Sequence, residues 1–322
     1  MLKLNITPLL TRGLLHFCRI THVDGILIID KPEGFTSHDV VARLRRILKT
    51  KRIGHTGTLD PFATGVLVML VGKATRLAQF IDKDEKEYEA VVRFGFETDT
   101  GDRTGSPKSK VQSPRVLTVE NIEQVLAQFR GEIEQIPPMY SAKKVDGKKL
   151  YEHARRGVEI EREPIKVNLK KLEVLSEPAA VAGGSEIQDL KLHVVCSAGT
   201  YIRTLAEDIG RAVGTGAHLE ELRRTRAGVF DLSQAATIEQ LDADESPSKR
   251  LLPMVLAVEH LRKFILDDDR VEKTRSGLST GAGDAEFSDG QSISMMDSNG
   301  EIVAIGFFNG AENSIRPKIV LV

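Results

Sequence analysis

The stretch Gly54-His55-Thr56-Gly57-Thr58-Leu59-Asp60-Pro61-Phe62-Ala63-Thr64-Gly65-Val66-Leu67 decides the fold, because it joins a segment rich in glycine and threonine to an apolar run. We expect a loop over residues 50–60. The run VLVMLV at 66–71 predicts a central, buried strand. Asp60 lies at this junction, and Pro61 restricts the backbone beside it. A carboxylate there can be held rigidly and still face a cleft. Taken alone, such an aspartate is more often a turn residue, and that alternative stays open.

Alternating strands and helices are predicted on both sides of this stretch. Strands are predicted from apolar and β-branched runs at 25–29, 86–96, 158–175 and 187–197. Helices are predicted at 37–49 with Ser37 as N-cap, and at 74–81, 118–129, 148–156, 200–213 with Thr200 as cap, and 216–224. Residues 97–115 are expected to be a loop and 242–253 a linker. The remaining runs SISMMD, EIVAIGFF and KIVLV predict a small β-rich C-terminal domain after a mixed α/β catalytic domain.

The charge balance excludes a histone-like polycation. In 322 residues, Lys and Arg number 45 and Asp and Glu 46, so the net charge is -1. Binding to nucleic acid is not excluded, because phosphates are attracted by local patches of charge. Hydrophobic residues at 41% and charged residues at 28% are typical of a globular chain, which excludes a disordered or fibrous protein.

Cysteine content and hydropathy point to a reduced, cytoplasmic compartment. Cys18 and Cys196 cannot form a disulfide framework, and the chain has no CxxC motif. No apolar run approaches the roughly 18 residues that a membrane-spanning helix needs. Residues 1–23 are expected to be a disordered extension or an over-long start, with a targeting role as the alternative.

A phosphate-binding loop is excluded near Gly72-Lys73. The pattern GxxxxGK[ST] would need glycine at 67 and serine or threonine at 74, where the chain has Leu67 and Ala74. A nucleotide kinase is therefore disfavoured.

HTGTLDPFATGVL at 55–67 resembles the catalytic motif of the TruB family, the bacterial tRNA pseudouridine(55) synthases. Further blocks with the same resemblance occur in the same order: DGILIIDKPEGFTSHDVV (24–41), GKATR (72–76), KEYEAVVRFGFETDTGDRTG (86–105), QIPPMYSAKKVDGKKLYEHARRG (135–157) and CSAGTYIRTLAEDIG (196–210). The resemblance spans about residues 24–232. Residues 1–23 have no counterpart in it, and the C-terminal region matches only loosely.

The resemblance implies an α/β (α+β) protein with the pseudouridine synthase fold, a mixed, antiparallel-rich sheet with flanking helices. Its catalytic domain would span 24–250 and carry an RNA-clasping insertion at about 130–157. A small PUA-like β-barrel that binds RNA would follow at 255–322, and a generic β-barrel is the alternative for that region.

By the same resemblance, Asp60 is the catalytic aspartate. Pseudouridine formation breaks the C1′–N1 glycosidic bond and joins C1′ to C5 of the uracil. A carboxylate can stabilise or capture the positive charge that develops at C1′. It can instead remove the C2′ proton and form a glycal, and both routes stay open. Neither route needs a metal or an organic cofactor, so we expect none.

The resemblance also implies a pocket for a uridine flipped out of folded RNA. His55 would enter the space that the flipped base leaves, Tyr88 would stack on the uracil, and Arg203 would pair with Asp60. A loop histidine, a core tyrosine and a solvated helix arginine are the alternatives. The other residues implied to bind substrate are Tyr201, Leu222, Lys31 and Arg76. Arg76 departs from the family pattern, in which a lysine can stand, and Lys31 could instead support the catalytic loop.

Three groups of basic residues are candidates for contact with the RNA backbone, although a charge run is often only a solvated helix face. The candidates are Arg43, Arg45, Arg46, Lys51 and Arg52 in the first group, Lys143, Lys144 and Lys148 in the second, and Arg223 with Arg224 and Arg226 in the third. The expected partner is the T stem-loop of tRNA. We expect no membrane contact and no obligate protein partner, and a monomer. A guide-RNA-dependent synthase and a tRNA-folding chaperone remain alternatives, the second also as an additional role.

Overall fold

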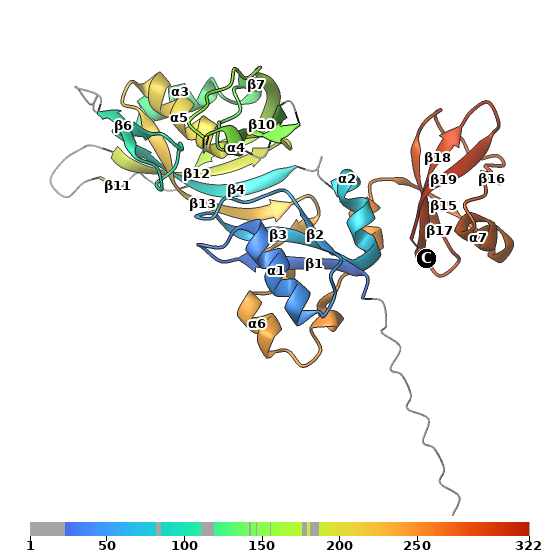
Figure 1. Ribbon diagram of the computed structural model, residues 1–322. Coiled ribbons are helices and arrows are strands. Elements are labelled where there is room, and N and C mark those ends of the chain that lie inside the picture. The colour runs from blue at the N-terminus through green and yellow to red at the C-terminus, as the bar shows by residue number, and fades with distance from the viewer. Residues whose placement is uncertain are drawn as a thin grey trace, which may run out of the picture.

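The computed structural model describes residues 23–81, 85–110, 119–141, 143–145, 147–154, 156–175, 179–180 and 187–321. The predicted extension at 1–23 falls almost wholly outside these residues. The main element is a ten-stranded sheet in the order β1-β3-β13-β4-β12-β10-β7, with β2, β11 and β14 attached at its sides (Figure 1). These strands are β1 (Gly25–Lys31), β2 (Ile53–Thr56), β3 (Thr64–Val71), β4 (Lys86–Phe94), β7 (Gly131–Gln135), β10 (Ile165–Val174), β11 (Ala179–Ala180), β12 (Ile187–Cys196), β13 (Ala217–Ala227) and β14 (Phe230–Asp231).

The strand β3 is the buried centre that its apolar sequence predicts. It pairs with β1 along one edge, and its other edge is shared by β2 and the parallel strand β13. Its two faces enter two different cores, because successive side chains of a strand point to opposite faces. Val66, Val68 and Leu70 lie in one core, and Leu67 and Met69 lie in the other. The strand therefore fixes the end of the predicted catalytic loop, residues 57–63, which carries Asp60.

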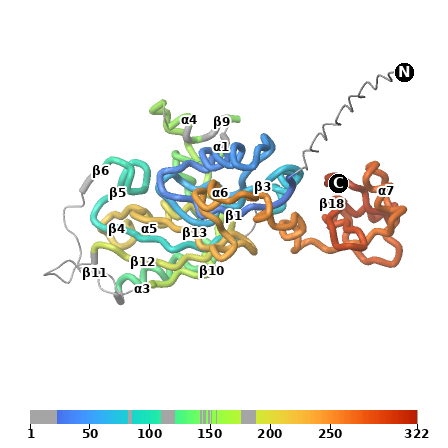
Figure 2. Tube along the Cα trace, turned by 90° about the horizontal axis from the view of Figure 1, so that it is seen from below, coloured from blue at the N-terminus to red at the C-terminus, as the bar shows by residue number. Residues whose placement is uncertain are grey.

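Helices cover the sheet unevenly (Figures 1 and 2). α1 (Ser37–Ile47) and α6 (Ile238–Ala243) pack on β1 and β3, while α3 (Val119–Ala127) and α5 (Ile202–Val213) pack on β4, β12 and β10. The opposite face of β4 and β12 carries charged side chains in cross-strand pairs, such as Lys191 with Glu89.

The remaining elements of this part are η1 (Gly72–Leu77), α2 (Ala78–Ile81), β5 (Phe96–Thr98), β6 (Pro107–Lys110), β8 (Lys144–Val145), β9 (Lys148–Lys149), α4 (Leu150–Ala154), η2 (Leu232–Gln234), η3 (Pro247–Arg250) and η4 (Met254–Val258).

The helix predicted at 216–224 is wrong, because these residues belong to β13. Two bulges, between Leu219 and Glu221 and between Arg224 and Arg226, each insert one residue into the strand. The first bulge places the buried Leu219 and Leu222 three residues apart, which imitates the spacing of a helix. Pairing with β3 and β4 on its two sides then overrides the helix propensity of the Glu and Arg side chains.

Smaller differences concern caps and connections. Thr36, not Ser37, is the N-cap of α1, and it forms a capping box with Asp39. α5 begins after Tyr201 without a side-chain cap. The loop predicted at 50–60 contains β2, and the loop at 97–115 contains the β5–β6 hairpin. The predicted linker at 242–253 forms backbone hydrogen bonds with β1 through Leu252 and Ile26.

The C-terminal part is a five-stranded curled sheet in the order β15-β17-β18-β19-β16, with one helix, α7. Its elements are β15 (Arg262–Ile265), α7 (Asp268–Arg275), β16 (Thr280–Gly281), β17 (Ser292–Met296), β18 (Ile302–Asn309) and β19 (Ser314–Val320). Ile305, Ile319 and Leu321 pack against α2 and η4, so the two parts share a core. Among the described residues, no helix is long and apolar enough to cross a membrane.

Candidate active site

Asp60 and Arg203 form a two-point ion pair between the catalytic loop and the start of α5. The Nε atom of Arg203 lies 2.9 Å from Oδ2 of Asp60, and its Nη2 donates to Oδ1 at 3.2 Å. The arginine side chain is only 7% exposed, whereas that of Asp60 is 33% exposed. A guanidinium held in this way fixes the direction of the carboxylate and leaves it open to a bound molecule.

Arg203 also holds two neighbouring loops. Its Nη1 donates to the carbonyl of Thr100 at 3.0 Å, and its Nη2 donates to the carbonyl of Tyr140 at 2.7 Å. Asp102 lies 3.7 Å from Nη1, and it accepts hydrogen bonds from Thr100 and Thr104. The predicted insertion and the turn at 99–105 therefore meet at the residue that orients Asp60.

The electrostatic environment of Asp60 is set by competing effects. Burial raises the pKa of its carboxyl, and the guanidinium of Arg203 opposes this rise. Asp102 raises the pKa further, and Lys31 lowers it. Asp60 therefore releases its proton at a higher pH than a solvated aspartate does.

Two side chains, those of Lys31 and Ser37, hold the loop that carries Asp60 by hydrogen bonds to its backbone. Lys31 is fully buried, and its Nζ donates to the carbonyls of Pro32, Phe35 and Pro61 at 2.9, 2.7 and 3.2 Å. The hydroxyl of Ser37 donates to the carbonyl of Leu59 and accepts from its N–H. Both residues adjacent to Asp60 are thus fixed. Lys31 supports the loop, which is the alternative that the sequence left open for it.

Replacing Lys31 with methionine is expected to lower the free energy of unfolding by about 2–4 kcal/mol, because three partly buried carbonyls lose their charged donor. Desolvation lowers the pKa of Lys31 to about 8. Between pH 8 and the pKa of the unfolded chain near 10.5, the native state binds fewer protons, so the wild type gains stability relative to Lys31→Met over this range. Urea denaturation at pH 7 and pH 10 measures both effects. Lys166→Met, at an exposed ion pair with Glu132, is the matched control and should change little. A Lys31→Met protein as stable as the wild type would refute the supporting role.

Two of the predicted pocket residues, Tyr88 and Leu222, belong to the core that also contains Leu59, the residue before Asp60. Tyr88 on β4 is 6% exposed and Leu222 on β13 is 8% exposed, and both belong to the core between the sheet and α5. Burial raises the pKa of the Tyr88 hydroxyl. Tyr201 is held at its backbone by Gln135, whose amide bonds both its N–H and its carbonyl. Tyr88 and Leu222 have packing roles in this structure, and their contacts with substrate stay predictions.

His55 and Arg76 lie outside the core that contains Tyr88 and Leu222. His55 is on β2, and its ring meets that of His38 edge to face at 5.7 Å. Arg76 on η1 donates to the carbonyl of Val320 at 2.5 Å, so it links the catalytic part to the C-terminal sheet. The sequence offered no sign of this contact, since the partners are 244 residues apart.

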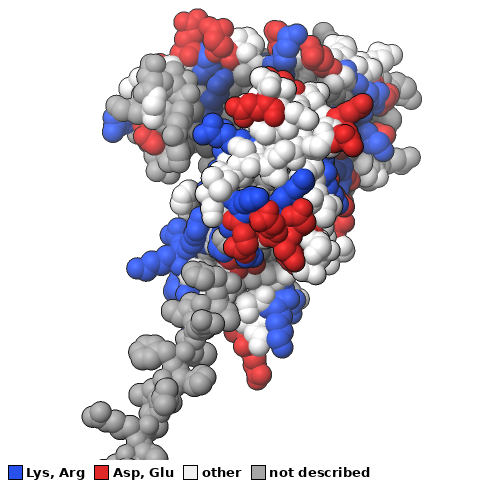
Figure 3. Space-filling model, turned by 90° about the vertical axis from the view of Figure 1, so that its right-hand side faces the viewer, with Lys and Arg blue, Asp and Glu red and all other residues white. Residues whose placement is uncertain are grey.

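The residues of the first basic group differ in their exposure and in their ion pairs. Arg45, Arg46, Lys51 and Arg52 are exposed, whereas Arg43 pairs with Asp242. Lys144 and Lys148 are in the β8–β9 hairpin, and Lys143 precedes it. Viewed from the side of the C-terminal domain, the surface shows basic and acidic side chains interspersed (Figure 3).

In the third basic group only Arg224 is buried, and the two partly exposed arginines are paired with carboxylates, so their contact with RNA stays a prediction. Arg223 pairs with Asp30, and Arg226 pairs with Glu85 and Glu87. Arg224 is 1% exposed. Residues of β13 alternate between the two faces of the sheet, so adjacent arginines have opposite surroundings.

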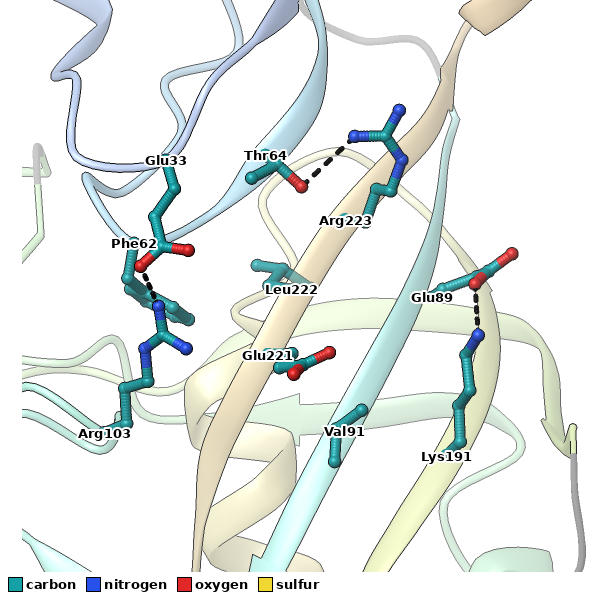
Figure 4. Close-up of a pocket in the computed structure, with 10 residues that line it drawn as sticks. All are labelled: Glu33, Phe62, Thr64, Glu89, Val91, Arg103, Lys191, Glu221, Leu222 and Arg223. Atoms are coloured by element: carbon teal, nitrogen blue, oxygen red, sulfur yellow. Dashed lines mark hydrogen bonds and ion pairs between the residues drawn. The ribbon is translucent and has the colours of Figure 1, made fainter.

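A cavity of about 320 Å³ lies on the uncovered face of the sheet (Figure 4). Glu89, Val91 and Glu221 form its floor, and Arg103 pairs with Glu33 at its rim. Glu89 and Val91 alternate with Tyr88 along β4, so they point away from the helix-covered side. Phe62 and Leu222 are among the residues that line the cavity. Asp60 is not among the described residues that line it.

Sequence reasoning missed Ser37, Gln135 and Asp102 as supports of this site. Ser37 was interpreted as a helix cap, and its bond to Leu59 joins residues 22 positions apart. The run Thr98–Asp99–Thr100–Gly101–Asp102 did signal a turn, but not that it faces Arg203. Among the described residues, no group of three or more His, Cys, Asp or Glu side chains could hold a metal ion.

Comparison with known proteins agrees with this geometry. Residues 45–202 match the family model "TruB family pseudouridylate synthase (N terminal domain)", and residues 203–267 match "tRNA pseudouridylate synthase B C-terminal domain". A "tRNA pseudouridine synthase B" of Solibacter usitatus is 43% identical over 88% of this chain and 95% of the relative. One of Bacillus subtilis is 38% identical over 93% of this chain and 98% of the relative.

Solved structures give a similar result. The chain resembles a protein in the "Structure of H/ACA RNP bound to a substrate RNA containing 2'-deoxyuridine", with a TM-score of 0.70 and 28% identity over 94% of this chain and 86% of that one. It resembles one in a Cbf5-Nop10-Gar1 complex with the same TM-score and 31% identity, again over 94% of this chain and 86% of that one.

Proposed function

The chain belongs to the TruB family and is a tRNA pseudouridine synthase, an isomerase, and on this premise we propose that Asp60 is its catalytic carboxylate. The observation that carries the proposal is the ion pair with Arg203, which orients a partly exposed carboxylate next to Leu59, a member of the core that contains Tyr88 and Leu222. The pair favours the ionised form of Asp60 against the effect of burial. An ionised carboxylate is what the reaction needs, whether it stabilises C1′ or removes the C2′ proton.

The substrate we propose is a uridine in the T loop of tRNA, flipped out of its stack into the space beside Asp60. Tyr88 would stack on the uracil, with Leu222 and Tyr201 lining the pocket and His55 occupying the gap in the loop. Flipping costs a few kcal/mol, which these replacement contacts would offset.

We also propose a role for each part of the chain. Residues 24–250 would carry the chemistry, the insertion at about 130–157 would clasp the stem-loop, and the curled sheet at 255–322 would act as a PUA-like RNA-binding domain. Arg76 supports this division, because its bond to Val320 fixes the sheet against the catalytic part. We place the reaction in the cytoplasm.

We further propose that the protein acts alone, unlike the proteins of the H/ACA and Cbf5-Nop10-Gar1 complexes that it resembles. The full-length match to bacterial relatives supports this reading. The test is incubation of the purified protein with an unmodified tRNA transcript, followed by mapping of pseudouridine. Modification of a T-loop uridine is expected. If modification required an added guide RNA or protein, the stand-alone reading would fail.

The exposed charges in the last turn of α1 and just after it should contact the RNA backbone. The double variant Arg46→Gln/Lys51→Gln is expected to weaken tRNA binding and to reduce the slope of log K against log salt concentration by about 2, because two phosphate contacts are lost. The single-turnover rate at saturating enzyme should stay unchanged. Filter binding from 50 to 300 mM salt, a range chosen around the values where such slopes are resolved, gives the slope. An unchanged slope would assign these residues to the solvated helix face.

A further inference from the structure

Arg224 is a buried cation in the middle of the sheet, next to the proposed catalytic loop. It is among the largest fully buried side chains of the described residues, at 1% exposure. No ion pair joins it to a carboxylate in the described part of the chain. A guanidinium in such a place is costly unless its N–H groups are bonded, so its bonds should have a purpose in the fold or in the reaction.

Its bonds clamp the two ends of the catalytic loop. Nε donates to the carbonyl of Val66 at 2.7 Å, and Nη2 donates to the carbonyl of Gly57 at 2.7 Å. Asp60 lies between these two carbonyls in the sequence. A single rigid group thus closes the base of the loop, while Lys31 and Ser37 hold its middle.

The backbone around Arg224 is built for close approach. Arg224 pairs with Gly65 of β3 on one side and with Tyr88 of β4 on the other. A Cβ atom on Gly65 would lie 2.2 Å from the carbonyl oxygen of Arg224, and one on Gly57 would lie 3.2 Å from its Nη1. Both glycines have positive φ angles, 98° and 63°. The loop can meet the guanidinium only because these positions lack side chains.

Arg224 also lies beside Tyr88. The two residues pair in register across β13 and β4, and burial raises the pKa of the Tyr88 phenol while the charge of Arg224 lowers it. Tyr88 is the aromatic residue proposed to stack on the flipped uracil. One buried residue therefore bonds the loop that carries Asp60 and pairs, in the sheet, with the residue whose ring is proposed to face the base.

We propose that Arg224 is a positioning residue that fixes Asp60 relative to Tyr88, because it bonds the carbonyls of Gly57 and Val66 from the strand position that pairs with Tyr88. It touches neither substrate nor RNA backbone. The inference rests on the proposed function, in that the positioned groups are its proposed catalytic and stacking residues.

The test compares Arg224→Gln and Arg224→Lys with the wild type in single-turnover modification of a tRNA transcript. The rate at saturating enzyme is expected to fall about 100-fold in Arg224→Gln, the effect of a displacement of about 1 Å. Arg224→Lys should be partly rescued, because an ammonium keeps the charge but cannot span both carbonyls in the fixed geometry of a guanidinium. The dissociation constant for tRNA and its salt slope should equal those of the wild type in both variants.

The opposite pattern would overturn the inference. If Arg224 belonged to a basic surface, the variants would bind tRNA more weakly, with a salt slope reduced by about 1 at an unchanged saturated rate. An unchanged rate and affinity would overturn it as well. Arg93→Gln on β4, a half-exposed arginine paired with Asp189, is the matched control and should behave as the wild type.

Two further measurements keep the outcome clear. Thermal unfolding shows whether Arg224→Gln is folded. If it is not folded, the saturated rate of Arg224→Lys is the deciding measurement. A rate equal to that of the wild type would refute the positioning role of Arg224. An inactive wild-type protein would instead refute the proposed function, before any variant is compared.

Discussion

Replacing Asp60 with asparagine is expected to reduce pseudouridine formation by about 10⁴-fold or more, the range seen when a group that reacts covalently or by proton transfer is removed. That loss corresponds to about 5.4 kcal/mol of transition-state stabilisation. Asparagine keeps the shape of the side chain but can neither capture C1′ nor remove the C2′ proton at a useful rate. Single-turnover assays on a tRNA transcript, with pseudouridine mapped by position, measure the loss.

The fold and the RNA affinity should survive this change. Arg203 keeps its bonds to the carbonyls of Thr100 and Tyr140, so the surrounding loops stay anchored. Asp189→Asn, on the uncovered face of the sheet, is the matched control and should retain full activity. Substantial modification by Asp60→Asn would remove Asp60 from the chemistry. A tRNA-folding role, if present, would persist in the same inactive variant.

Replacing Arg203 with alanine should lower the saturated rate by about 10³-fold while tRNA binding is retained. The variant loses the cation that opposes the effect of burial on Asp60, so the pKa of this carboxyl rises further. Because the ionised form is the active one, the acid limb of the pH–rate profile should move to higher pH. The variant should therefore be more impaired near pH 6 than near pH 8.

Arg203→Lys separates charge from geometry. Lysine restores the cation but cannot bond Asp60, Thr100 and Tyr140 together, so the acid limb should return toward that of the wild type while the rate stays low. Equal losses of tRNA affinity and of rate in Arg203→Ala would contradict a role at the active site.

Local patterns predicted the elements whose periodicity is regular. β1 and β3 were expected from short apolar runs, and α1 from apolar residues on one helix face, because each buries side chains at the period of its own secondary structure. β13 was mistaken for a helix because its bulges break the alternation of a strand. The predicted N-cap of α1, Ser37, is one residue too late, since Thr36 and Ser37 are both suited to the position.

The sequence by itself determined the family, the α/β class and the candidates Asp60, Tyr88 and Arg203, because these depend on local motifs that survive without knowledge of contacts. Only the tertiary structure decided what each basic residue does. Arg224, Lys31 and Arg76 look alike in the sequence as charged residues, yet one clamps the catalytic loop, one supports it and one joins the C-terminal sheet. The physical reason is that the cost or benefit of a charge depends on its burial and its partners, and each of these residues has a partner between 30 and 244 residues away.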